Sequence, residues 1–242
     1  MPTNYKLAII ALGAYEQHSK HLPFETDTII ANAIIENLKS RLDNTYLFLP
    51  TQEIGYSPEH SFNSNSKTIS YQQAIENIIT QAQYCNNLGI KKLLIINTHG
   101  GNSPIMQIAA MEIREKMHML CAYTSWLRFG IPDDLITTED RAYDIHAGFI
   151  ETSVMLHIAP NLVNMRKAKN FSNKQQKYSE EFKYLRAYGP HSFAWMMNDL
   201  NSDGACGNAA NATAKAGEII FTHSCNEIIE LINDINKFDI SF

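Results

Sequence analysis

Four residues of the chain carry side chains that commonly bind transition-metal ions. Glu16 and His18 lie in a polar loop that follows the apolar run 7–12. If this loop is extended, both side chains point to the same side, because side chains alternate along an extended backbone. Asp27 stands just before a helical pattern, and His99 directly follows a second apolar run. Two carboxylates and two imidazoles form the mixed ligand set that zinc, manganese and iron accept, so we predict a metal site formed by these four residues.

Three of the four residues also have a simpler structural interpretation. Asp27 suits the N-cap of the helix that follows it, His99 could form a hydrogen bond within a turn, and Glu16 could be a solvated loop charge. Their combination favours the metal site, because open α/β sheets bind ligands at the carboxyl ends of their strands, where these loops are expected.

The placement of the four residues depends on a predicted alternation of strands and helices. Apolar runs bounded by turn residues predict strands at 7–12, 46–50, 92–97 and 120–126. Helical periodicity predicts helices at 28–42, 71–88, 104–118, 149–159 and 209–237, the last interrupted near Gly217. Ser103 is the expected N-cap of the helix that begins at Pro104. This alternation is typical of an α/β fold with a mostly parallel sheet covered by helices.

The rest of the chain shows no internal repeat and no domain boundary, so we expect a single domain over residues 1–242. The polar segment 164–190 is expected to form a mobile excursion over the surface. The four cysteines are far apart and form no CxxC pair, so we interpret them as reduced, buried side chains without a chemical role.

Composition excludes several other classes of protein. The chain has 242 residues, 45% of them hydrophobic, which rules out disorder. Its net charge is −5 and its basic residues do not cluster with aromatic ones, so we do not expect it to bind nucleic acid. Apolar runs reach only about five residues, against the roughly 20 that a membrane-spanning helix needs, and the N-terminus lacks the layout of a signal peptide. We therefore expect a cytoplasmic protein that contacts no membrane.

Beyond the four candidate ligands, the chain contains blocks of polar and glycine residues in a distinctive order. They are Glu16-Gln17-His18 with His21-Leu22-Pro23 and Asp27, then Gly55-Tyr56-Ser57-Pro58-Glu59-His60, Asn97-Thr98-His99-Gly100-Gly101-Asn102, His146-Ala147-Gly148 with Glu151-Thr152-Ser153, and Asp203-Gly204-Ala205-Cys206-Gly207-Asn208. These blocks resemble the creatininase (creatinine amidohydrolase) family over about the whole chain, and their combination is highly specific.

The resemblance implies a three-layer α/β/α sandwich with a mostly parallel central sheet that holds two divalent metal ions, which are zinc, manganese or iron. Glu16 and His99 would bind one ion, His18 would bind the other, and Asp27 would bridge both. The resemblance also implies a small-molecule substrate and a homo-oligomer, usually a hexamer.

Two glycines depart from the pattern of the creatinine-hydrolysing members. Gly101 stands where those members have a glutamate that binds the second metal, and Gly100 stands where they have a tyrosine near the substrate. In this chain either Glu151 or water completes the second site, or the second ion binds weakly. The turn that commonly ends Phe-Pro-Gly-Thr is replaced by the longer, polar segment 61–68, which bears on what enters the pocket.

The resemblance and the chemistry of the candidate ligands predict the same reaction, the hydrolysis of a C–N amide bond in a small molecule. Two ions that share a carboxylate lower the pKa of a bridging water, so that hydroxide can attack the amide carbonyl. His146 is the candidate for proton transfer to the leaving nitrogen or for support of the oxyanion. Glu151, five residues later, is the second catalytic candidate, either as a metal ligand or as a residue that orients one.

The sequence leaves the substrate open. A creatinine-like lactam is one alternative, whereas the His-Gly-Gly-Asn form of the motif favours a formamide in a flavin or deazaflavin precursor. A third branch of the family is a peptidase of cofactor maturation. Gly101 is also compatible with a non-catalytic binding protein that has lost one metal. We expect structural roles for the remaining histidines, including His21 and His60, and for Trp126 and Trp195.

Overall fold

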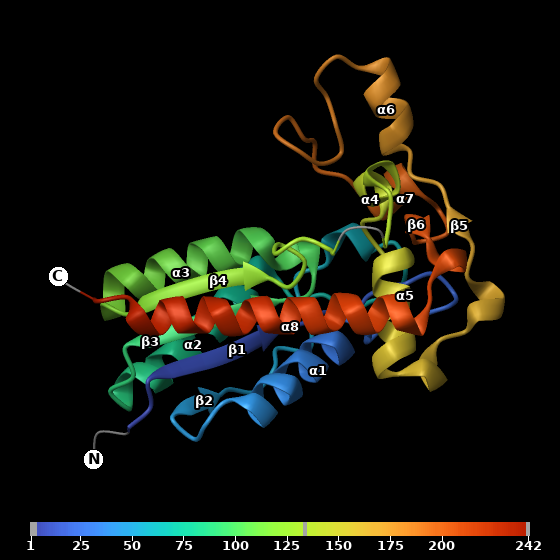
Figure 1. Cartoon of the computed structure of the whole chain (residues 1–242). Helices are drawn as coiled ribbons and strands as arrows, with labels where there is room; N and C mark the ends of the chain where they lie inside the picture. Colours follow the sequence, from blue (N-terminus) through green and yellow to red (C-terminus); the bar gives the residue numbers. More distant parts are fainter. Residues whose placement is uncertain (1–3, 133–134, 241–242) are drawn as a thin grey trace.

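The centre of the structure is a four-stranded parallel sheet (Figure 1). The computed structural model describes residues 4–132 and 135–240. The strands are β1 (Leu7–Leu12), β2 (Tyr46–Phe48), β3 (Lys92–Asn97) and β4 (Leu120–Ser125), in the order β2-β1-β3-β4. Leu12 pairs with Asn97, and Asn97 pairs with Ser125 on its other side. The carboxyl ends of β1, β3 and β4 are therefore level at one edge of the sheet.

Helices cover both faces of this sheet. On one face lie α1 (Thr26–Arg41) and α8 (Ala214–Lys237), with α5 (Phe149–Ile158) packed against both, and on the other lie α2 (Tyr71–Asn87) and α3 (Ser103–Met117). Strand side chains alternate between the two layers: Ile9 and Ile96 pack in the first, whereas Ile10 and Ile95 pack in the second. Both faces are covered, so the central strands β1 and β3 are almost continuously apolar. The predicted α/β/α sandwich with a mostly parallel sheet is confirmed.

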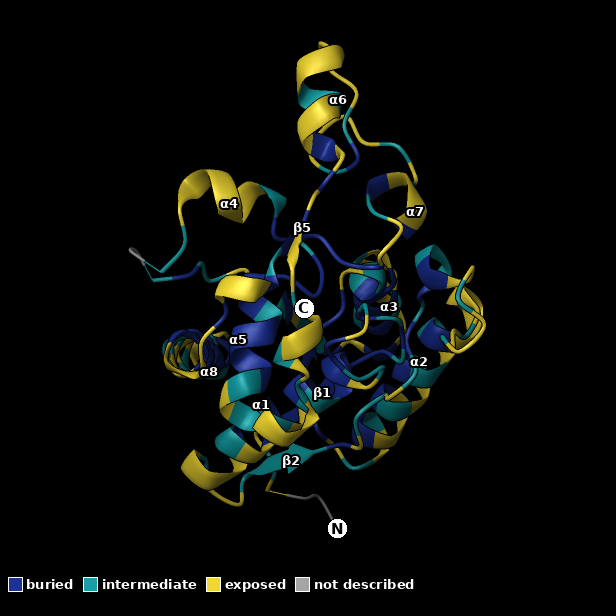
Figure 2. Cartoon of the chain, turned by 90° about the vertical axis from the view of Figure 1, so that its right-hand side faces the viewer, coloured by how far each residue is buried: buried dark blue, intermediate teal, exposed yellow. Residues whose placement is uncertain are grey.

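A long excursion between α5 and α8 rises beyond the carboxyl edge of the sheet (Figures 1 and 2). It contains β5 (Asn170–Phe171), α6 (Gln175–Glu181), α7 (Met197–Leu200) and β6 (Gly207–Asn208), and β5 pairs antiparallel with β6. A further short helix, α4 (Thr138–Tyr143), precedes α5 on the same side. The expectation that segment 164–190 only runs over the surface is wrong, because Phe171 and Ala187 are buried and part of the segment lines the cavity described below.

Predicted and observed element boundaries agree within two residues, except at the start of the last helix. There, α8 begins at Ala214, and the side chain of Thr213 caps it by accepting a hydrogen bond from the Ala216 N–H. The predicted interruption near Gly217 is also wrong. A Cβ atom at this position would overlap the carbonyl of Ser153, so glycine allows α8 to lie directly against α5. In the described part of the chain, no helix is long and apolar enough to span a membrane.

Two predicted helix caps are wrong as well. Because α1 begins at Thr26, Asp27 lies inside the first helical turn, where its side chain is buried. Similarly, α3 begins at Ser103 itself, and Asn102 directs its side-chain amide into contacts with neighbouring loops rather than onto the helix. The side chains of Asp27 and Asn102 therefore make their contacts at the carboxyl edge of the sheet instead of capping a helix.

Candidate metal centre

The four predicted ligands lie on loops and in the first turn of a helix, at the carboxyl edge of the sheet. Glu16 and His18 follow β1, His99 follows β3, and Asp27 lies in the first turn of α1. Thr98 ties these segments together, because its N–H donates to the carbonyl at the end of β1 at 3.0 Å. Its hydroxyl lies 2.8 Å from the carbonyl oxygen of Asp27. The register of the sheet thus brings the ligand-bearing segments to one place.

One buried amide, that of Asn102, holds three loops at this edge. Its nitrogen donates to the carbonyl of Gly13 at 3.0 Å, and its oxygen accepts from the N–H of Tyr56 at 3.0 Å. A Cβ atom at Gly55 would lie 2.7 Å from the Gly13 carbonyl oxygen and 2.8 Å from the Asn102 amide oxygen, so a larger residue does not fit between the loops. The loops that follow β1, β2 and β3 are therefore packed backbone to backbone.

Among the residues that it describes, the structure brings candidate ligands together in three groups of three residues. One of them, formed by Glu16, His18 and His146, shares a residue with each of the other two. The first ligand group consists of Glu16, Glu59 and His99, and the second ligand group consists of His18, Asp27 and Glu151. Within each group, one candidate ligand atom from each residue lies within 4.8 Å of the others. Ligand atoms at about 2.1 Å from a tetrahedral ion lie roughly 3.4 Å apart, so both groups are close to the size that an ion requires.

Asp27 lies between the two groups. Its Oδ1 atom is 3.8 Å from Nε2 of His18, and its Oδ2 atom is 3.6 Å from Nδ1 of His99. The two carboxylate oxygens therefore face two different imidazoles, which is the arrangement of a carboxylate that bridges two ions.

Buried polar atoms without partners mark the same place. Among the described residues, Glu16 Oε2, His18 Nε2 and Asp27 Oδ2 are buried and make no hydrogen bond. An unpaired buried polar atom costs on the order of 1–3 kcal/mol, so folded proteins rarely leave several of them together. Two bound divalent cations would pair with all three. The donor set present in the chain therefore fits a metal centre.

Glu59 lies behind His99 and was given no role by the sequence argument. Its Oε1 atom is 3.4 Å from His99 Nε2, while His99 Nδ1 lies 3.1 Å from Oε1 of Glu16. When Nδ1 faces Glu16, the contact at Nε2 suits Glu59 as an outer partner that fixes the ring. The Tyr56 carbonyl, 3.1 Å from the same Nε2 atom, supports this orientation. The signal in the sequence was a carboxylate directly before His60 in a motif block.

Gly101 makes room for the contact between Glu59 and His99. A Cβ atom at position 101 would overlap His99 Nε2 and the Tyr56 carbonyl, and would lie 2.7 Å from Glu59 Oε1. A glutamate at this position, which the creatinine-hydrolysing members have, does not fit this arrangement. Gly100 is different, because a Cβ atom there meets nothing within 4 Å.

Among the alternatives for completing the second site, the geometry favours Glu151. Its Oε2 atom lies 3.6 Å from His18 Nε2 and accepts a hydrogen bond from the Ala147 N–H at 2.7 Å. Burial raises the pKa of Glu151 to about 8, although His18 opposes the shift. Burial disfavours the charged form of His18, but Asp27 and Glu151 outweigh it and raise the pKa of His18 to about 9. A bound divalent cation would keep the carboxylates ionised and the imidazole neutral.

The start of α5, which carries Glu151, is held by the buried carboxylate of Asp144. This carboxylate accepts hydrogen bonds from the N–H groups of Phe149 at 2.6 Å and Ile150 at 3.2 Å. Side chains at Gly148 or Gly207 would overlap it. Burial raises the pKa of Asp144 to about 6, against the opposing effect of these hydrogen bonds. Sequence reasoning missed this support, although two glycine-bearing motif blocks surround it.

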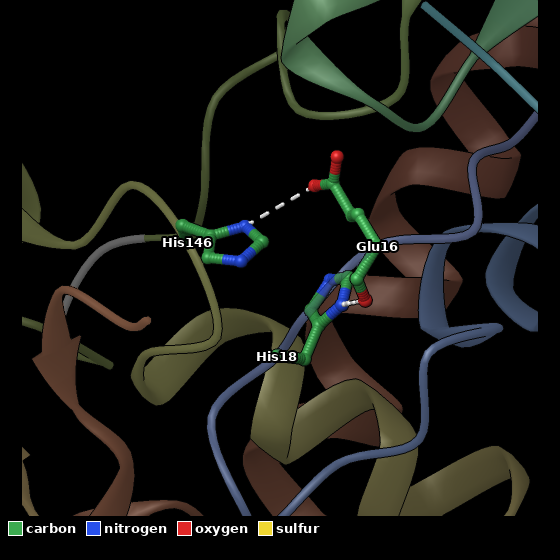
Figure 3. Close-up of side chains that lie close together, drawn as sticks. All are labelled: Glu16, His18 and His146. Carbon is green, nitrogen blue, oxygen red and sulfur yellow. Dashed lines mark hydrogen bonds and ion pairs between the residues drawn. The ribbon is translucent and has the colours of Figure 1, made fainter. Parts of the chain in front are cut away.

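His146 lies on a different loop from Glu16 and His18 and directs a ring nitrogen toward the carboxylate of Glu16 (Figure 3). Its Nε2–H donates to the carbonyl of Gln17 at 2.7 Å, so Nδ1, 3.6 Å from Oε1 of Glu16, is the nitrogen that faces the site. Burial, together with the nearby His18 and His60, holds the pKa of His146 well below its ordinary value. The ring is therefore a neutral imidazole with an available lone pair on Nδ1.

The other residues discussed from the sequence divide into two kinds. His21 is structural: its Nε2 atom lies 3.0 Å from the hydroxyl of Thr152. His60 lies at the site, with Nε2 at 3.6 Å from Glu16 Oε1. Trp126 is buried in the core as expected, whereas Trp195 lines the cavity. The four cysteines are free.

A cavity of about 1160 Å³ opens above the cluster. Glu16, His60, His99 and His146 form part of its lining, and the excursion between α5 and α8 supplies Tyr188, Phe193, Trp195 and Met196. Drug-sized ligands typically occupy pockets of about 300–1,000 Å³, so this cavity has room for more than a single small ring.

The fold and the buried cluster define a class of protein, an α/β/α protein with a candidate two-metal centre at the carboxyl edge of a parallel sheet. The sequence profile of the creatininase family, described as creatinine amidohydrolase, matches residues 2–232. The chain therefore belongs to the creatininase family, whose members are hydrolases that act on amide bonds.

Relatives within this family differ in what they act on. A mycofactocin precursor peptide peptidase from Mycolicibacterium smegmatis is 26% identical over 224 residues, which are 91% of this chain and 81% of that protein. A 2-amino-5-formylamino-6-ribosylaminopyrimidin-4(3H)-one 5′-monophosphate deformylase from Methanocaldococcus infernus is 26% identical over 194 residues, which are 76% of this chain and 81% of that protein.

Solved structures share the fold. A Bacteroides fragilis protein assigned as a creatinine amidohydrolase has a TM-score of 0.78 and 24% identity, covering 98% of this chain and 92% of that one. A manganese form of creatininase has a TM-score of 0.76 and 18% identity, covering 96% of this chain and 92% of that one.

Proposed function

We propose that the chain hydrolyses a C–N amide bond of a small molecule with the help of two divalent metal ions. The observation that carries this proposal is the position of Asp27 between the two ligand groups, with one oxygen directed to His18 and the other to His99. Glu16, Asp27 and His99 would hold the first ion. His18, Asp27 and Glu151 would hold the second.

The metal pair, when bound, would supply a hydroxide nucleophile near neutral pH and polarise the amide carbonyl. Manganese and zinc are the expected ions because structural neighbours are a manganese form and a zinc form of creatininase, and iron is a further candidate. In this arrangement Glu59 fixes the ring of His99 through Nε2, and the Ala147 N–H fixes the carboxylate of Glu151.

His146 would move the proton that the reaction needs. Its Nε2–H is held by the carbonyl of Gln17, so the proton is taken up and released at Nδ1, which faces the cluster. Its lowered pKa keeps the ring neutral before the reaction, and a neutral imidazole can accept a proton and then donate it to the leaving nitrogen.

The cavity supports a substrate larger than creatinine. Gly100 leaves open space in its lining, and aromatic side chains from the excursion line its wall. A formamide of a ribosylaminopyrimidine is the alternative that the deformylase relatives suggest, and a short peptide is the one that the peptidase relatives suggest. Creatinine itself remains a substrate to be tested.

The test is steady-state turnover of creatinine, a formylaminopyrimidine nucleotide and a short peptide by protein loaded with manganese, zinc or iron. We expect one of the two larger substrates to be hydrolysed and the activity to disappear with a chelator. Absence of turnover on every amide would contradict the proposal. One tightly held ion or none per chain would favour the non-catalytic binding protein.

We also propose that the chain forms a homo-oligomer, with the hexamer suggested by the family resemblance. Light scattering should then give the mass of six chains of 27.4 kDa each. A monomer at micromolar concentration would contradict this part of the proposal.

A further inference from the structure

One permanently charged basic side chain lines the cavity above the metal centre. Among the described lysines and arginines, Arg128 alone takes part in this lining. Its side chain is exposed, and it makes no hydrogen bond or ion pair with any residue that the structure describes. No described residue therefore occupies the donors of this guanidinium, which lines the cavity.

The backbone around Arg128 is fixed rather than free. Arg128 follows β4 by three residues, and its N–H donates to the carbonyl of Ser125 at 2.9 Å. The next carbonyl, that of Phe129, lies 3.3 Å from Nε2 of His223 on α8. Trp126 is buried in the core, and Phe129 packs against it. The turn thus anchors its apolar side chains in the core and leaves Arg128 at the cavity.

The acidic groups that line the cavity contact residues of the candidate metal centre. Glu16 and His99 belong to the ligand set, and Glu59 contacts His99. Much of the rest of the lining is aromatic or apolar, including Tyr188 and Trp195. Such surfaces bind the flat or apolar body of a ligand, while an unpaired guanidinium binds phosphate or carboxylate through two parallel hydrogen bonds.

We infer that the substrate carries an anionic group, a phosphate or a carboxylate, which pairs with Arg128 while its amide lies at the metal centre. This inference rests on the proposed function, because it assigns a second contact to the substrate of the same site. It makes Arg128 a specificity-determining residue, one that selects the substrate without taking part in the bond cleavage.

The test uses two matched pairs of substrates with the manganese-loaded protein. One pair is a formylaminopyrimidine riboside with and without its 5′-phosphate, and the other is a short peptide with a free carboxyl terminus and its carboxamide. Arg128→Gln should lower kcat/KM for the charged member roughly 10- to 100-fold and should change the uncharged member by less than about twofold. Arg128→Lys should restore part of the loss, because it keeps the charge but not the planar fork.

The control variant is Arg166→Gln. Arg166 is also an exposed arginine, but it lies in the 3-10 helix Met165–Lys167 and does not line the cavity. Arg166→Gln should leave kcat/KM unchanged for both substrates of each pair. A preference confined to the phosphate pair or to the carboxylate pair would identify the source of the anion.

The inference is overturned if Arg128→Gln lowers kcat/KM equally for the two substrates of each pair, or lowers it for neither. Absence of turnover with every substrate would overturn the proposed function, and Arg128 would then be tested by calorimetric titration with the deformylated nucleotide and its dephosphorylated form. Tighter binding of the phosphorylated compound to the unmodified protein, lost in Arg128→Gln, supports the inference even in that case. Equal binding of the two compounds overturns it.

Discussion

The two ligand groups are built from different parts of the fold. The first ligand group lies on loops and a short 3-10 helix at the edge of the sheet. There, β3 and the segment after β2 place His99 and Glu59 beside Glu16. The second ligand group joins that edge to α5, which supplies Glu151 from far along the chain. The first group therefore depends on the register of the sheet, and the second depends on how α5 docks against it.

This difference has a consequence for Asp27, which belongs to the second ligand group and also faces His99 of the first. Asp27 belongs to the first turn of α1, next to the sheet and close to α5, so its two oxygens reach both groups. Removing its charge should damage both, whereas a change at Glu151 or at Gly101 should damage one group more than the other.

The largest effect is expected for Asp27→Asn. The amide replaces one anionic oxygen with a nitrogen that cannot bind a cation, so both ions should be lost together and activity should fall below detection. Metal analysis of the purified variant and a turnover assay check this. Full activity, or the retention of both ions, would remove Asp27 from the centre.

A smaller and more selective effect is expected for Gly101→Ala. The added Cβ atom collides with His99 Nε2 and with the Tyr56 carbonyl, so it should displace His99 and weaken the first ion. Loss of a histidine's outer contact typically costs about 10- to 100-fold in metal affinity, and we expect a loss of that order. Calorimetric titration with manganese measures it.

Gly100→Ala is the matched control for this substitution, because a Cβ atom at position 100 meets nothing within 4 Å. It should bind both ions as the unmodified chain does. Equal metal affinities in the two alanine variants would show that the contact between Glu59 and His99 does not support the first group.

The comparison also explains what could be predicted from the sequence. Strand and helix periodicity located the sheet and its edge, because both faces of the sheet are covered and its central strands are almost continuously apolar. The candidate ligands Glu16, His18 and His99 were predicted because they lie in loops after those strands, and Asp27 because it stands at the start of a helix. The resemblance supplied Glu151 and His146 as catalytic candidates, and the geometry favours Glu151 for completing the second group.

Other features were not predictable in this way because they depend on packing between distant segments. Asp144 supports α5 only because two glycines, Gly148 and Gly207, leave space for its carboxylate. The excursion has short elements with little periodicity, so its buried residues, such as Ala187, were assigned to the surface. Glu59 has no strand beside it to mark it as a ligand partner.

A smaller effect, on the free energy of unfolding, is expected from Asp144, which holds the start of α5 and so supports the second ligand group. The pKa of Asp144 is raised to about 6 in the folded chain, so its ionised form is disfavoured there. Its contribution to stability is therefore fully present below pH 4 and is lost as the pH rises through 6, by about 3 kcal/mol at most. The variant Asp144→Asn has no ionisable group at this position, so its stability does not change with pH for this reason.

Urea unfolding of the metal-free protein between pH 4 and pH 8 tests the prediction for Asp144. The difference in free energy of unfolding between the unmodified chain and Asp144→Asn should shift in favour of the variant as the pH rises through this interval. A difference that is independent of pH would show that the buried carboxylate does not titrate as its surroundings imply.

The most direct test of the two-metal centre is the metal content of the unmodified chain and of Glu151→Gln, measured after purification without chelator. The amide keeps the shape of the side chain and its contact with the Ala147 N–H, but it removes the anionic ligand of the second group. We predict two ions per unmodified chain and one per Glu151→Gln chain, with the remaining ion held by Glu16, Asp27 and His99. One ion in the unmodified chain, or two in the variant, would contradict this account.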